Sequence, residues 1–183
     1  MARFASLTML MVVAACATQN ARPPQTTPHF ALSPASLGRE LSLQQQLRFS
    51  FPRGERSFDA YLESDAKEVR LAAMLSGQTA LRIVWDGNNL QVRRADWLPE
   101  VVDAAAVLSD LQLVYWPLPA LRAALPPGWR LEDSAEGRRL WQGDELVTDV
   151  HYSDRASEPR HIRIDHPGLH MRLDIESVSA DAS

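Results

Sequence analysis

Residues that could act as nucleophiles or bases are scattered along this sequence without a known catalytic motif. No serine lies in a Gly-x-Ser-x-Gly elbow, and no GxGxxG or Gly-Lys-Ser/Thr loop could cradle a phosphate. Ser50, Ser57 and Ser153 lie in or beside strand-like stretches, and the only lysine, Lys67, lies in a predicted turn. We therefore predict that the protein is not an enzyme. A hydrolase is kept as a third hypothesis, because a Ser-His-Asp triad is assembled in space and not in sequence.

Four histidines lie in the last third of the chain: His151, His161, His166 and His170. His166 and His170 are separated by Pro167-Gly168, so they lie across a turn and not on one helix face. A metal site needs several converging ligands. We interpret the four as exposed histidines of strands and turns, and we expect no metal and no cofactor.

The only cysteine, Cys16, follows a short N-terminal apolar run. Residues 5–15 are uncharged and too few to span a bilayer, which takes about 20, but they fit the apolar region of a secretory signal. The run ends in Val13-Ala14-Ala15-Cys16, which resembles the lipobox of bacterial lipoproteins. In that class the chain is cut before the cysteine, whose thiol is acylated, typically with palmitate. The alternative is an ordinary signal peptide cut after Ala15 that leaves Cys16 free.

The lipobox resemblance implies three segments: a signal peptide at 1–15, a lipidated Cys16 with a flexible tether at 16–32, and one domain at 33–183. Three prolines and several polar residues make the tether segment extended or disordered. Ala17 stands where Asp would signal retention in the inner membrane of Gram-negative bacteria. The expected location is therefore the periplasmic face of the outer membrane, with a lipid anchor.

Composition fits one globular domain that does not bind nucleic acid. The chain has 183 residues, of which 45% are hydrophobic and 23% charged, and its formal net charge is -4. Nucleic-acid binding needs a clustered positive face, and the sequence has no basic run.

Alternating apolar and polar residues predict about ten short strands in two groups. The first group covers residues 41–51, 58–63, 69–75, 80–85 and 90–93, and the second covers 129–132, 138–142, 145–152, 160–165 and 169–177. In the first stretch the apolar phase breaks only at Gln45.

A helical insert separates the two groups. Residues 99–115 are apolar on nearly every side, which predicts a buried helix, and 119–125 predicts a second short helix. A further short helix is expected from Ser33-Pro34 to about residue 41. Asp110 lies in the apolar stretch, where an unpaired carboxylate is costly, so we expect a structural role with a partner such as Arg122 or a place at an exposed edge.

The predicted fold is mainly β with a helical insert (α+β): a strongly curved antiparallel half-barrel of about ten strands covered by helices. A two-sheet sandwich with a helical crossover is the alternative.

The element order over residues 41–175 resembles the lipoprotein-localisation fold of LolB and its periplasmic carrier LolA. The resemblance is best over 69–92 and continues through 111–125. The sequence Leu-Val-Tyr-Trp-Pro-Leu-Pro in that second stretch also resembles the sequences of an uncharacterised family of outer-membrane lipoproteins related to LolB.

The LolB resemblance implies an apolar cavity for acyl chains under a helical lid. Our candidates for its wall are Leu47, Phe49, Leu71, Leu81, Ile83, Trp85, Leu108 and Leu113. In LolB a leucine in the loop between the third and fourth strands helps to deliver lipid to the membrane, and Leu75 stands at the matching position. Here the Pro-Leu-Gly of that loop reads Met74-Leu75-Ser76-Gly77, so both protrusion and packing of Leu75 stay open.

The resulting hypothesis is an outer-membrane lipoprotein that binds the acyl chain of a lipid or lipoprotein and assists its transfer or insertion. Its expected partners are the membrane, through acylated Cys16, the acyl chain itself, and a periplasmic LolA-like carrier. The alternative is a non-catalytic scaffold lipoprotein of envelope assembly with a filled cavity and a protein partner.

Overall fold

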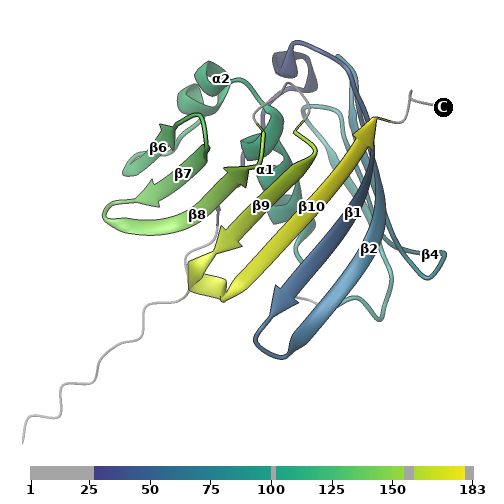
Figure 1. The fold of residues 1–183 in the computed structure, drawn as a ribbon. Helices are drawn as coiled ribbons and strands as arrows, with labels where there is room; N and C mark the ends of the chain where they lie inside the picture. The colour runs from purple at the N-terminus through teal and green to yellow at the C-terminus, as the bar shows by residue number, and fades with distance from the viewer. Residues whose placement is uncertain (1–26, 100–101, 155–158, 180–183) are drawn as a thin grey trace, which may run out of the picture.

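In the computed structural model, which describes residues 27–99, 102–154 and 159–179, ten antiparallel strands form one continuous sheet (Figure 1). The first five strands are β1 (Leu41–Phe51), β2 (Gly54–Ser64), β3 (Val69–Leu75), β4 (Gln78–Trp85) and β5 (Leu90–Arg94). The last five are β6 (Trp129–Asp133), β7 (Gly137–Gln142), β8 (Glu145–Tyr152), β9 (His161–His166) and β10 (Met171–Ser179).

The strand order shows how the sheet is built from two meanders. The order is β5-β4-β3-β2-β1-β10-β9-β8-β7-β6, so each group of five pairs in sequence and the two groups join where β1 pairs with β10. Within the described residues β5 and β6 end the sheet without pairing to each other, so the sheet is not closed. The mainly β fold with an open antiparallel sheet is confirmed, and the two-sheet sandwich is wrong.

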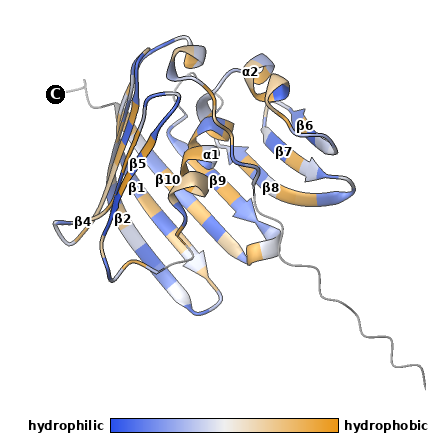
Figure 2. Cartoon of the chain, turned by 180° about the vertical axis from the view of Figure 1, so that it is seen from behind, coloured by the Kyte–Doolittle hydropathy of each residue, from blue (hydrophilic) through white to orange (hydrophobic). Residues whose placement is uncertain are grey.

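The helices lie between the two meanders in sequence. α1 (Ala104–Tyr115) and α2 (Leu118–Ala123) connect β5 to β6. The sheet curves around α1, which lies on its concave side, while α2 lies beside β6 (Figures 1 and 2). Orange and blue alternate along the strands in Figure 2, as expected for one wet face and one apolar face.

The boundaries of the helical segments differ from the prediction. The helix predicted over 99–115 begins at Ala104, because the Asp103 carboxylate accepts a hydrogen bond from the backbone N–H of Ala105 at 3.1 Å and caps the helix. The helix expected after Ser33 is a single 3-10 turn, Pro34–Leu37, that ends at Gly38 with a positive φ of 76°. A second 3-10 turn, Pro167–Leu169, joins β9 to β10.

The last part of the predicted tether belongs to the folded domain. Residues 27–32 lie along α1: the Phe30 backbone N–H donates to Ser109 Oγ at 3.0 Å, and the Leu32 carbonyl accepts from Gln112 Nε2 and Trp85 Nε1 at 3.1 and 2.8 Å. Phe30 is itself buried in the core. The prediction missed this because a segment of six residues is too short to show a period. The signal peptide, Cys16 and the tether as far as residue 26 lie outside the described residues.

None of the helices in the described ranges has both the length and the apolar character needed to cross a membrane.

Candidate functional site

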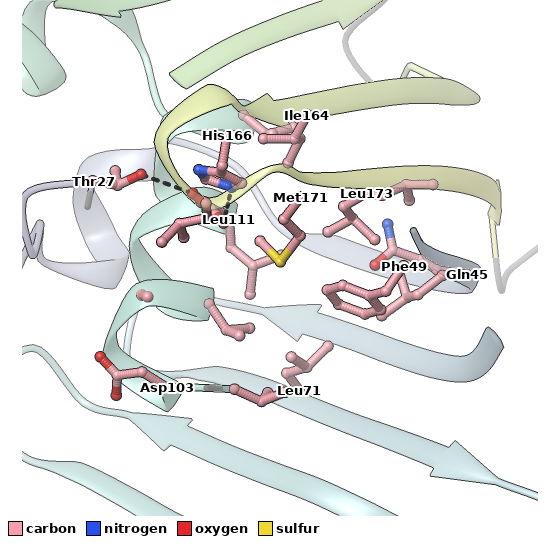
Figure 3. A pocket seen from close by; sticks show the side chains of 18 of the residues that line it. Thr27, Gln45, Phe49, Leu71, Asp103, Leu111, Ile164, His166, Met171 and Leu173 are labelled. Atoms are coloured by element: carbon pink, nitrogen blue, oxygen red, sulfur yellow. Dashed lines mark hydrogen bonds and ion pairs between the residues drawn. The ribbon is translucent and has the colours of Figure 1, made fainter. Parts of the chain in front are cut away.

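An apolar cavity lies between α1 and the inner face of the sheet (Figure 3). Its volume is about 160 Å³, which is room for roughly five or six water-sized groups at about 30 Å³ each. Its apolar lining is Leu47, Phe49, Phe51, Leu71, Val102, Ala106, Val107, Leu111, Val114, Ile164, Leu169, Met171, Leu173 and Ile175. The polar residues of the lining are Thr27, Gln45, Asp103, Asp110 and His166.

Exposure distinguishes two ends of this cavity. At the outer end Phe49, Phe51, Val107 and Met171 are only half-buried. At the inner end the lining is closed, and Gln45 is 3% exposed. Phe49 stacks on Phe51 with ring centroids 6.1 Å apart. The cavity is therefore a pocket whose half-exposed aromatic rim leads to a buried inner end.

A row of buried polar groups lies beside the apolar lining. His166 Nε2 lies 3.0 Å from Asp110 Oδ2, and Thr27 Oγ1 donates to Asp110 Oδ1 at 3.3 Å. Thr27 Oγ1 also lies 2.8 Å from Thr148 Oγ1. Asp110 thus has a histidine partner, and the expectation of Arg122 or an exposed edge is wrong.

The interpretation of His166 as an exposed turn histidine is also wrong, since it is 4% exposed at the end of β9. The alternation of β9 continues to the end of the strand, so His166 lies on the same buried face as Ile162 and Ile164. The other three histidines, at 151, 161 and 170, are exposed as predicted.

The Asp110–His166 pair favours a charged imidazole. Burial alone would lower the pKa of His166, but the nearby Asp110 charge, the Asp110 hydrogen bond and the more distant Asp165 outweigh it and raise that pKa. Among the described residues, no hydroxyl group hydrogen-bonds to His166. The pair can hold a proton next to the cavity, and the Thr27 hydroxyl group hydrogen-bonds to its Asp110 side.

The described residues contain no cluster of three or more His, Cys, Asp or Glu side chains that could hold a metal ion.

A buried arginine fixes α1 over the cavity. The last carbonyls of a helix have no partner within it. Arg138 on β7, 7% exposed, donates from Nη1 to the carbonyls of Leu113 and Trp116 at 2.6 and 2.9 Å, and its Nε donates to Asp133 Oδ1 at 2.9 Å. One side chain therefore ties the end of α1 to the second meander.

Three of the eight predicted wall residues line the cavity, namely Leu47, Phe49 and Leu71. The structure places the other five in the surrounding core: Leu81, Ile83, Trp85, Leu108 and Leu113. The β4 residues Leu81 and Ile83 lie beyond β3, and Leu108 and Leu113 are buried on other sides of α1. Periodicity identified them as inward residues but not which inward residues face the open space.

Leu75 is the last residue of β3, half-buried and packed against the core. The hairpin tip beside it is Ser76-Gly77, and both residues have positive φ, 49° and 78°, as a two-residue hairpin turn requires. The described structure therefore has Leu75 packing at the strand end, with two small residues at the tip.

Sequence reasoning missed most of the polar part of the site. Gln45 carried a signal, because it is the one polar residue at an inward position of the first strand, where the apolar phase breaks. Thr27 carried none, because it lies in a segment without a period. His166 and Asp110 are 56 residues apart, so only the folded structure brings them together.

The chain belongs to the DUF3261 family of proteins of unknown function, whose family profile matches residues 42–179. None of the curated proteins matches the chain. A solved structure of a DUF1329 family protein from Desulfovibrio piger is similar over 81% of this chain and 88% of its own, with 10% sequence identity and a TM-score of 0.41. The family is thereby established, and the resemblance to LolB stays an expectation.

Proposed function

We propose that this member of the DUF3261 family binds the acyl chain of a lipid or lipoprotein in its apolar cavity and assists the transfer or insertion of that molecule at the outer membrane. The observation that carries the proposal is the cavity itself. Fourteen of its nineteen lining residues are apolar, and a pocket of that kind suits a ligand that is mainly hydrocarbon.

Binding in this proposal needs no covalent chemistry. Each methylene group that leaves water contributes about 0.8 kcal/mol, and the half-exposed rim lets a chain enter without unfolding the sheet. A ligand held only by apolar contact is released when a membrane or another carrier offers it more burial. Transfer would therefore follow the difference in affinity between this cavity and the acceptor.

The N-terminus would place the cavity at the membrane. Acylated Cys16 anchors the chain to the periplasmic face of the outer membrane, and residues 17–26 link it to the segment that lies along α1. The proposed partners are thus the membrane, the acyl chain and a periplasmic LolA-like carrier that delivers it.

A fluorescent acyl probe tests the proposal with one variant in the cavity and one outside it. The protein is produced as residues 16–183 with Cys16→Ser, which keeps every residue that the structure describes. Ala106 lines the cavity from α1, and Ala106→Phe puts a phenyl ring into the space. Ala123→Phe makes the same change on the exposed side of α2.

We expect the unchanged protein and Ala123→Phe to bind the probe alike, and Ala106→Phe to bind it at least about tenfold more weakly. Equal binding by all three would place the probe elsewhere, and absence of binding would favour the scaffold alternative.

A further inference from the structure

Gln45 is a polar side chain at an apolar position of the cavity wall. It lies on β1 with its side chain on the inner face, between the buried residues Leu43 and Leu47, and it is 3% exposed. An amide buried in such surroundings is costly unless its polar atoms are hydrogen-bonded. The hydrogen bonds that Nε2 and Oε1 of this amide make or leave open therefore decide what the inner end of the cavity can bind.

The nitrogen of this amide donates both of its hydrogen bonds within the protein. Nε2 donates to Tyr115 Oη and to Ser177 Oγ, both at 2.9 Å. These partners come from α1 and β10, so they hold the amide from two sides. Burial raises the pKa of Tyr115 to about 12, against the lowering effect of its hydrogen bonds with Ser177 and Gln45, and the phenol therefore stays neutral.

The oxygen of this amide, Oε1, accepts no hydrogen bond from the described residues, although the atom is buried. Gln45 also lines the cavity, and Figure 3 draws its amide at the far side of the pocket from His166. The amide thus presents a hydrogen-bond acceptor, in fixed orientation, to the inner end of an apolar pocket.

The position of this acceptor restricts the ligand. Gln45 lies four residues along β1 from Phe49, the nearer half-exposed residue of the rim, which is about 13 Å at the rise of a strand. A chain that enters from the rim therefore reaches Gln45 with the part remote from its head group. A charged donor would be too costly at this depth, whereas a hydroxyl group is small, neutral and able to donate.

We infer that the preferred ligand is an acyl chain that carries a hydroxyl group remote from its head group, and that this hydroxyl donates a hydrogen bond to Gln45 Oε1. The inference rests on the proposed acyl binding and adds the chemical class of the ligand. A plain hydrocarbon chain would fill the same cavity but leave the amide oxygen buried without a partner, which weakens its binding.

The test compares dodecanoic acid with its monohydroxylated forms that carry the hydroxyl at successive carbons of the distal half. Affinities are measured by displacement of the fluorescent acyl probe from residues 16–183 with Cys16→Ser. We expect at least one hydroxylated form to bind about tenfold more tightly than dodecanoic acid. This comparison uses the protein without any change in the cavity, so it does not depend on the folding of a cavity variant.

Two variants test whether Gln45 causes the preference for a hydroxylated chain. Gln45→Met replaces the amide by an apolar side chain of similar length and should abolish the preference, mainly through tighter binding of dodecanoic acid. Gln46→Met makes the same change at the next residue, which is exposed on the outer face of β1, and should leave the preference intact.

Three results are informative against the inference. If no hydroxylated form binds more tightly than dodecanoic acid, or if the preference survives in Gln45→Met, Gln45 does not select a hydroxyl group, and acyl binding itself stands. If neither dodecanoic acid nor its derivatives displace the probe, the proposed function fails and the inference fails with it.

Discussion

The size of the cavity predicts how affinity depends on the length of a bound acyl chain. The cavity volume of about 160 Å³ holds roughly five or six methylene groups, because a methylene group is similar in size to a water molecule, which takes about 30 Å³. Each methylene that enters contributes about 0.8 kcal/mol. Because a factor of ten corresponds to about 1.4 kcal/mol, each added carbon should tighten binding about fourfold.

The increase should stop when the cavity is full. Saturated fatty acids of increasing even length are titrated against the fluorescent acyl probe, below their critical micelle concentrations. We expect affinity to rise steeply while roughly five or six methylenes enter the cavity and then to level off, since further methylenes stay in water.

Ala106→Phe provides an internal control for this length dependence. Its ring takes room in the same cavity, so the plateau should move to shorter chains while the slope below it stays the same. A rise in affinity without a plateau, or a plateau that Ala106→Phe does not move to shorter chains, would refute the assignment of this cavity as the binding site.

Three further predictions concern stability and location. Because Asp110 raises the pKa of His166 above its unfolded value of about 6.5, the stability that the pair contributes should be full below that pH and be lost as pH rises through the folded pKa. Urea unfolding should show the difference in stability between the unchanged protein and His166→Gln shrinking as pH rises above about 6.5. A difference that grows would contradict the charged pair. Arg138→Met should lower the free energy of unfolding by about 3–5 kcal/mol, because it removes the buried hydrogen bonds of Arg138 to Asp133 and to the carbonyls at the end of α1. Arg139→Met removes an ion pair whose arginine is exposed and should cost no more than about 1 kcal/mol. Similar losses in the two variants would contradict the capping role. When residues 1–15 are replaced by an ordinary secretory signal and Cys16 by Ser, the protein should move from the membrane fraction to the soluble fraction, since the acyl chains supply the anchoring free energy. Retention in the membrane fraction would contradict the lipobox.

The strands could be predicted from the sequence because one face of the sheet is exposed to solvent and the other is apolar, so polar and apolar residues alternate with a period of two. The helical insert was equally readable, since residues 104–115 are apolar on nearly every side. What periodicity could not give was the position of α1 over the sheet. That position decides that Leu71 faces the cavity while Leu81 and Ile83 lie in filled core.

The polar part of the site was less predictable, for a related reason. Asp110 and His166 are adjacent only because β9 returns to the helix. Residues 27–32 are held by hydrogen bonds to Ser109 and Gln112 and by the single buried ring of Phe30, which makes no periodic pattern. Gln45 is the exception. A polar residue at an inward position costs free energy, so its presence in the sequence already marked the place where the wall of the cavity differs from ordinary core.

The most direct test of the central claim is native mass spectrometry of residues 16–183 with Cys16→Ser, purified without detergent, followed by organic extraction and analysis of the extract. The account predicts a bound species with the mass of an acyl lipid, present in the unchanged cavity and depleted in Ala106→Phe. A protein that carries nothing and also takes up no added fatty acid would contradict it, and would direct attention to the scaffold alternative and its protein partners.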